Sequence, residues 1–223
     1  DRGENPTTGS SSYVNGSVVA YDSTLHPPGD AVYNGGFDTM SYAAVAKNVI
    51  TVGSVTDAVT SGLRDKAKAT VSSFSSWGPT DDGRIKPDVV ANGEALYSSL
   101  STTDTAYASY SGTSMASPNA CGSAALLVQQ YSQLFANQSM RSSTLKGLLI
   151  HTADDIGNPG PDYKTGWGLV NVKASADVIQ DHSTYPTKHR ITESLVNTST
   201  PTQSLLFVWD GVSPIRATLC WTD

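Results

Sequence analysis

Residues 110–118 constrain the fold more than any other segment, because they place one serine directly before a run of small side chains. They read Tyr-Ser-Gly-Thr-Ser-Met-Ala-Ser-Pro, and a helix-compatible run, residues 119–131, follows at once. Pro118 fits a helix start, because the first turn has no internal partner for the N–H that proline lacks. The pattern therefore predicts a helix that carries Ser114 at its N-terminus.

The side chains of this predicted helix are unusually small. We expect a thin helix that is buried close against a sheet. At its start, unpaired backbone N–H groups and the positive end of the helix dipole favour negative charge. A serine hydroxyl there suits nucleophilic catalysis, although Gly-Thr-Ser alone is more typical of a plain N-cap. The small residues are Ala116, Ala120, Gly122, Ala124 and Ala125.

The apolar runs at residues 49–55 and 89–91 fit short buried strands of a parallel sheet, and helical patterns follow later in the chain, so we expect both α and β structure. Ser143 is the expected N-cap of the second helix. Residues 1–45 are rich in Gly, Ser, Asn and Pro and predict surface loop with at most short strands, such as residues 16–21. The other predicted elements are strands at residues 49–55, 89–91 and 95–100, an extended segment at 107–110, and helices at 143–154 and 172–179.

From residue 182 onward the pattern changes to apolar–polar alternation. Residues 205–209 and 215–221 predict strands. Two or three strands cannot bury an apolar face alone. We therefore expect residues 1–181 to form an α/β domain, and residues 182–223 to form a linker and the first strands of an antiparallel β-sandwich.

Charge and composition exclude several classes of partner. The net charge of −6 argues against a nucleic acid, which needs a basic face. The sequence contains no apolar run of 18 residues, so no membrane span is predicted. The chain starts at Asp1 without a signal peptide, so we expect a processed or excised segment. Cys121, within the thin helix, is expected to be a small buried apolar residue rather than a disulfide partner of Cys220.

The segment Gly-Thr-Ser-Met-Ala-Ser-Pro resembles the nucleophile motif of the subtilisin-like serine peptidases. Residues 46–53, 74–79, 83–88 and 166–171 resemble further segments of that family in the same order, so the likeness spans residues 46–180. It implies a three-layer parallel-sheet domain, and residues 219–223 are similar to the branch that carries a C-terminal β-sandwich. Asn92 and Asn119 depart from the family, which usually has Pro and His there.

Transferred residue by residue, the resemblance implies that Ser114 is the acylating nucleophile of a serine endopeptidase. The backbone N–H of Ser114, assisted by the Thr113 hydroxyl, would form the oxyanion hole. Protein or peptide substrate would bind along the preceding residues, and the location would be extracellular or otherwise extracytoplasmic. The implied substrate-binding residues are Ser109, Tyr110, Ser111 and Gly112.

The resemblance also implies a catalytic Asp and His upstream of the serine, in that order. His26 lacks the family's His-Gly-Thr pattern, Asp38 lacks its Asp-Thr-Gly pattern, and Asn5 is a poor substitute for the oxyanion asparagine. We expect the upstream part of the same peptidase to supply the two missing triad members. The chain alone is then expected to lack useful peptidase activity.

Two other functions are compatible with the residues. One is a non-catalytic, peptidase-like binding domain. The other is an α/β-hydrolase with Ser114, an acid at Asp154 or Asp155, and a histidine at His182 or His189. No cofactor is needed for either peptidase or hydrolase chemistry.

Structural calcium is a further expectation that the family resemblance suggests. Calcium takes oxygen ligands from carboxylates and loop carbonyls. The candidate ligands by residue type are Asp81, Asp82 and Asp88.

Overall fold

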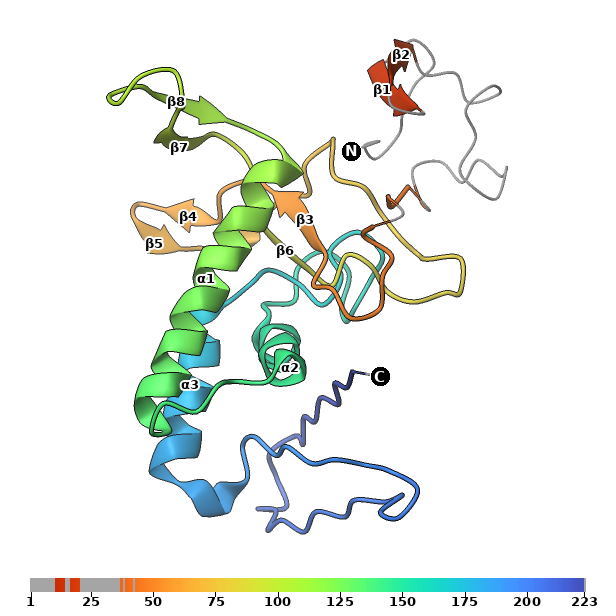
Figure 1. Cartoon of the computed structure of the whole chain (residues 1–223), viewed down its shortest axis with the longest axis vertical. Coiled ribbons are helices and arrows are strands. Elements are labelled where there is room, and N and C mark those ends of the chain that lie inside the picture. Colours follow the sequence, from red (N-terminus) through yellow and green to blue (C-terminus); the bar gives the residue numbers. More distant parts are fainter. Residues whose placement is uncertain (1–10, 15–16, 21–36, 38, 42, 223) are drawn as a thin grey trace. The chain divides into compact units, whose positions relative to one another are not determined.

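A computed structural model describes residues 11–14, 17–20, 37, 39–41 and 43–222 of the chain (Figure 1). Asn5, His26 and Asp38, considered above for catalysis, lie outside these residues. The chain forms two compact units, which are described separately. The first unit comprises Asp1–Gly122 and Ala153–Val170, and the second comprises Ser123–Thr152 and Asn171–Asp223.

The order of elements is mixed α/β, as the sequence predicts. The strands are β1 (Ser11–Val14), β2 (Ser17–Ala20), β3 (Val52–Val55), β4 (Val59–Thr60), β5 (Leu63–Arg64), β6 (Val89–Asn92), β7 (Leu96–Ser99) and β8 (Tyr107–Tyr110). The helices are α1 (Thr113–Leu134), α2 (Ser142–Thr152) and α3 (Val172–Thr184), with single 3₁₀ turns η1 (Lys66–Lys68) and η2 (Pro186–Lys188).

The first unit is built around a parallel pair of strands, β3 and β6, which confirms the two buried strands predicted from apolar runs. Val52 lies opposite Val89, and Val55 lies opposite Asn92. Val55, Val89 and Val90 are fully buried. Leu169 extends this pair by a parallel bridge to Val90. The core cluster that includes the pair is Val55, Ala58, Val90, Ile156 and Leu169.

A buried ion pair fixes the segment that leads into β6. The Lys86 Nζ lies 2.7 Å from the Asp88 Oδ2, and the Lys86 side chain is only 2% exposed. The ammonium also donates to the Val49 carbonyl and the Thr51 hydroxyl, both at 3.1 Å. The same Asp88 oxygen accepts from the Thr51 backbone N–H at 2.7 Å. The pair therefore ties the entrance of β6 to the entrance of β3.

We predict that Asp88→Asn lowers the free energy of unfolding by about 3 kcal/mol, because it leaves the Lys86 ammonium buried without its counter-charge. The double variant Lys86→Met with Asp88→Asn should lose less, since no unpaired charge remains. Urea denaturation of the three proteins measures both effects. An Asp88→Asn variant that is as stable as the unsubstituted protein would contradict this account.

Helix α1 is longer and more exposed than the small-residue pattern predicts, and Pro118, expected in the first turn, is the sixth residue of the helix. Ala116 and Ala120 are buried, as expected for one face of the helix. Gly122, Ala125 and Cys121 are exposed, so the expectation of a fully buried helix and of a buried Cys121 is wrong for this chain. Residues four apart share one helix face, and among the described residues only that face is covered.

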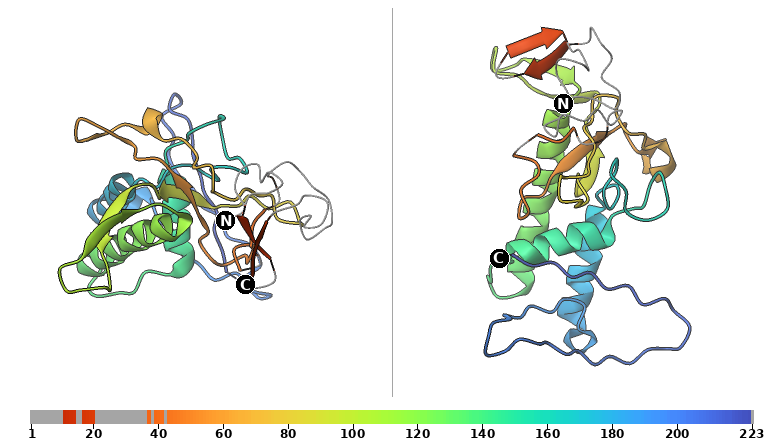
Figure 2. Two further views of the ribbon diagram at one scale, coloured as in Figure 1. Left: turned by 90° about the horizontal axis from the view of Figure 1, so that it is seen from above. Right: turned by 90° about the vertical axis from the view of Figure 1, so that its right-hand side faces the viewer.

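The second unit contains two helices that cross each other, α2 and α3 (Figure 2). The Thr152 hydroxyl of α2 lies 2.6 Å from the Ser175 hydroxyl of α3. Helix α2 begins at Ser142, so Ser143 lies in its first turn and is not its N-cap. Helix α3 begins where predicted, with Asn171 capping its start by accepting from the Ala174 N–H, and it continues past the predicted end to Thr184.

The C-terminal segment does not contain the two predicted strands. Residues 205–209 and 215–221 have no sheet partner among the described residues. Their apolar side chains are exposed, with Leu206 94% accessible. Alternation of apolar and polar residues is insufficient to form a strand where no neighbouring strand completes its hydrogen bonds. The predicted boundary at residue 181 and the β-sandwich stay predictions.

The partly buried ring of His182, near the end of α3, is in surroundings that disfavour its protonated form. Its ring centroid lies 5.4 Å from that of Phe135, and its Nδ1 is buried without a hydrogen-bond partner in the described part of the chain. Burial is the main cause that lowers the pKa of His182; nearby His189 lowers it further, whereas Glu193 opposes the shift. Protonation therefore favours the unfolded chain.

We predict that the free energy of unfolding falls as the pH drops below about 6.5, the ordinary pKa of histidine, because the unfolded state binds the proton more readily. His182→Gln should show a smaller fall. Urea midpoints at pH 8 and pH 5 measure the difference. Burial also lowers the pKa of His151, which remains in both proteins. The difference between His182→Gln and the unsubstituted protein therefore isolates the contribution of His182. Identical pH dependence of the two proteins would refute the prediction.

Candidate active site

Ser114 lies where the sequence predicts, in the first turn of α1. The two-stranded hairpin β7–β8 leads directly into this helix (Figures 1 and 2). Leu96 of β7 lies opposite Tyr110 of β8, and Ser111 and Gly112 then turn the chain into the helix. The Ser114 side chain is exposed rather than sealed in the core. A serine hydroxyl in this position is accessible to a substrate.

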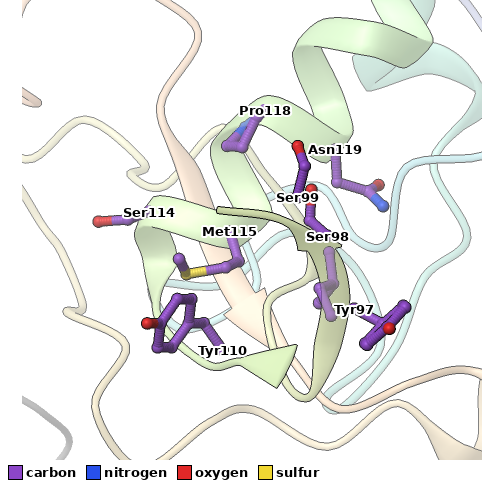
Figure 3. A pocket seen from close by; sticks show the side chains of 9 residues that line it. Tyr97, Ser98, Ser99, Tyr110, Ser114, Met115, Pro118 and Asn119 are labelled. Carbon is purple, nitrogen blue, oxygen red and sulfur yellow. The ribbon is translucent and has the colours of Figure 1, made fainter. Parts of the chain in front are cut away.

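A pocket of about 390 Å³ opens between the hairpin and the first turns of α1 (Figure 3). Its lining carries no charged side chain. In Figure 3 the Ser114 hydroxyl points away from Ser98, Ser99 and Asn119, and the Tyr110 ring lies beside Met115. The lining residues are Leu96, Tyr97, Ser98, Ser99, Tyr110, Ser114, Met115, Pro118 and Asn119.

The start of α1 is anchored by Gly112. The carbonyl of Gly112 accepts from the N–H of Met115 at 2.9 Å and from that of Ala116 at 3.3 Å. The Ser114 N–H precedes these two amides, and the first N–H groups of a helix have no acceptor within it. A donor next to the serine hydroxyl is thus available for negative charge, which the helix dipole also favours.

Gly112 is in turn attached to the end of the parallel strand pair. Its N–H donates to the Gly93 carbonyl at 2.7 Å, and the Gly93 N–H donates to the Val55 carbonyl at 3.0 Å. A Cβ on Gly93 would lie 2.2 Å from the Ser54 Oγ and 2.7 Å from the Gly112 carbonyl oxygen. Only glycine lets the two chain segments approach this closely.

The turn between β6 and β7 holds a non-glycine residue in the left-handed region, Ala95 with φ of +54°. Such a residue costs roughly 1 kcal/mol and persists where its surroundings hold it. The Ala95 N–H donates to the Ser111 Oγ at 2.9 Å. One residue earlier, the Glu94 N–H donates to the Asn92 Oδ1 at 3.0 Å. The polar side chain of Asn92, at a position where the resemblance implies proline, therefore stabilises this turn.

The structure places the four implied substrate-binding residues in different settings. Tyr110 lines the pocket, and Ser109 is exposed on β8. Ser111 uses its hydroxyl to bind the backbone of Ala95, and Gly112 uses its backbone to bind Gly93. Thr113 is the first residue of α1 and is partly buried. Their roles toward a substrate stay predictions.

Sequence reasoning missed the contribution of the β6–β7 turn to this site. The dipeptide Asn92-Gly93 indicates a turn, but neither the close approach of Gly93 to Gly112 nor the strain at Ala95 has a local signal. Both depend on residues that are 16 or more positions apart in the chain.

Two of the three candidate calcium ligands, Asp82 and Asp88, have other partners. Arg84 and then Thr80, through side-chain hydrogen bonds, lower the pKa of Asp82 to about 2. Asp88 is paired with Lys86, and Asp81 is exposed. Within residues 43–222 and the shorter described segments, no three His, Cys, Asp or Glu side chains gather as a metal site would require.

The acids of the alternative hydrolase triad are engaged elsewhere. The Asp154 Oδ2 accepts from both the Nε and the Nη2 of Arg64, at 2.9 and 2.7 Å. The Asp155 Oδ2 accepts from the Gly160 N–H at 2.8 Å. The His182 ring packs against that of Phe135 in a tilted arrangement. The α/β-hydrolase triad stays a prediction.

Comparison with known families identifies the family of this chain. The profile that describes the subtilase family, Peptidase S8, matches residues 29–168, well over half of the chain. The chain belongs to the subtilase family. This confirms the resemblance drawn from residues 46–180, and with it the α/β fold class.

Curated relatives of this subtilase chain are proteases by name. It is 35% identical to serine protease AprX of Bacillus subtilis over 65% of the chain and 34% of AprX. It is 33% identical to subtilisin DY of Bacillus licheniformis over 74% of the chain and 48% of that protein. The subtilase chain thus spans between a third and a half of the length of these relatives.

Solved structures support the same fold. The CspB protease of Clostridium perfringens superposes with a TM-score of 0.54 at 27% identity, covering 65% of the subtilase chain and 30% of CspB. The patellamide maturation protease PatA superposes with a TM-score of 0.50 at 23% identity, over 65% of this chain and 48% of PatA. Among the described residues, no helix is both long enough and apolar enough to cross a membrane.

We predict that Gly93→Ala lowers the free energy of unfolding by about 2 kcal/mol or more, because its Cβ would overlap the Ser54 hydroxyl and the Gly112 carbonyl. Gly122→Ala is the matched control, since nothing lies within 4 Å of the added Cβ. An exposed helical glycine replaced by alanine should stabilise the protein by about 0.5–1 kcal/mol. Equal effects of the two changes in urea denaturation would disprove the close approach.

Proposed function

We propose that this chain is the C-terminal part of the catalytic domain of a subtilisin-like serine endopeptidase, with Ser114 as its acylating nucleophile. The observation that carries the proposal is the position of Ser114: its hydroxyl is exposed at the N-terminus of α1, beside an uncharged pocket. Membership of the subtilase family and the names of the relatives support the same chemistry.

In the proposed reaction the Ser114 Oγ attacks a peptide carbonyl and forms an acyl-enzyme, and a histidine accepts the hydroxyl proton. The histidine then gives that proton to the leaving amine. The tetrahedral intermediate carries a negative oxygen, which the Ser114 N–H and the Thr113 hydroxyl would stabilise. Substrate would lie along residues 109–112, with Tyr110 at the pocket.

The histidine and its aspartate would come from the upstream part of the same peptidase. The relatives AprX and subtilisin DY are two to three times longer than the portion that this chain matches. Neither His26 nor Asp38 lies in the sequence pattern of the family's triad. Peptide or protein substrates, an extracytoplasmic location, structural calcium and a following β-sandwich domain belong to this proposal as well.

A fluorophosphonate probe tests the nucleophile directly. We predict that residues 1–223 alone are not labelled, because the three triad members act as a unit and two are missing. The full-length protein, which carries the upstream residues, should be labelled stoichiometrically at Ser114, as measured by mass spectrometry. Rapid labelling of the isolated chain would contradict the expected division of the triad.

Two serines in the same helix turn provide the control. Ser114→Ala in the full-length protein should abolish labelling, whereas Ser117→Ala, also exposed, should leave it intact. A full-length protein that folds but is never labelled would favour the alternative, a peptidase-like domain used for binding.

A further inference from the structure

The hydroxyl of Ser111 faces the backbone of the β6–β7 turn and not the pocket. It accepts a hydrogen bond from the Ala95 N–H at 2.9 Å, and Ser111 is absent from the residues that line the pocket. Family resemblance alone implies substrate contact at this position. The contact observed here instead joins the segment before Ser114 to a turn that precedes it by 16 residues.

Ala95 needs such a contact because its backbone is in the left-handed region, with φ of +54°. A residue with a Cβ disfavours this conformation, and the surrounding structure must impose it. Ala95 itself is exposed, so packing contributes little. The hydrogen bonds of the turn, from Ala95 to Ser111 and from Glu94 to Asn92, are therefore what hold it.

The conformation of this turn reaches Ser114 through two further hydrogen bonds. Gly93, two residues before Ala95, accepts from the Gly112 N–H at 2.7 Å. The Gly112 carbonyl then accepts from Met115 and begins α1. If the turn relaxes, Gly93 moves, and Gly112 and the first turn of the helix move with it. Small displacements of a reacting group are costly, since about 1 Å can reduce a rate by roughly 100-fold.

We infer that Ser111 is a positioning residue: by holding Ala95 in its left-handed conformation, it fixes the Gly93–Gly112 bridge and thereby the place of the Ser114 hydroxyl. This inference rests on the proposed function for its effect on catalysis, but the bridge itself can be tested separately. Ser111 thus has a different role from its neighbour Tyr110, which lines the pocket.

The test is a double-variant cycle in the full-length protein. Ser111→Ala should slow fluorophosphonate labelling of Ser114 and lower kcat by roughly 10-fold, with little change in KM. Ala95→Gly should restore both when added to Ser111→Ala, because glycine adopts a positive φ without help. Ser111→Thr, which keeps the hydroxyl, should behave like the unsubstituted protein.

Amide hydrogen exchange gives a readout that does not require catalysis. Exchange at the Gly112 N–H should be about 2- to 10-fold faster in Ser111→Ala, the range expected for the loss of one hydrogen bond. It should return to the original rate in the double variant. A protein that is never labelled but shows this exchange pattern would refute the proposed function and keep the positioning role.

Other outcomes would overturn the inference. If Gly112 exchanges at the same rate in Ser111→Ala, the hydroxyl does not hold the bridge. If Ala95→Gly fails to rescue, or if Ser111→Ala raises KM with kcat unchanged, Ser111 acts as a substrate contact. The matched control is Ser61→Gly, which relieves a similar φ of +52° in the β4–β5 turn and should not rescue Ser111→Ala.

Discussion

The hydrogen bond from the Gly112 N–H to the Gly93 carbonyl is the contact on which the candidate site depends. It joins the end of the buried parallel strand pair to the start of the helix that carries Ser114. Gly93 has no room for a side chain, because the Ser54 hydroxyl and the Gly112 carbonyl occupy that space. The edge of the sheet thereby holds the exposed Ser114 hydroxyl, and placement on rigid elements gives a site its precision.

The buried pair of Lys86 and Asp88 stabilises the opposite end of the same strands. It fixes the entrance of β6 against that of β3, so the register between Val52 and Val89 follows from charges as well as apolar packing. A slip of one residue would move every side chain to the other face of the strand. Correct register at the entrance is therefore a condition for the position of Gly93 at the exit.

The segments for which the sequence led to wrong expectations are exposed in the structure. Cys121 and Gly122 lie on an uncovered face of α1, and residues 205–209 lack a neighbouring strand among the described residues. Small side chains show that a helix face can be buried, and alternating polarity shows that a segment can pair as a strand. Neither pattern shows that another segment covers the face or pairs with the strand. The relatives AprX and subtilisin DY extend well beyond the portion that this chain matches.

The sequence by itself determined the elements that depend on local preference. Apolar runs predicted β3 and β6, small residues after Ser114 predicted the start of α1, and one specific motif identified the subtilase family. Only the tertiary structure decided which contacts those elements make. The bridge between Gly93 and Gly112, the bond from Ala95 to Ser111 and the contact of the His182 ring with Phe135 each join residues far apart in the chain. Such contacts arise from packing in three dimensions, for which residue order gives no local signal.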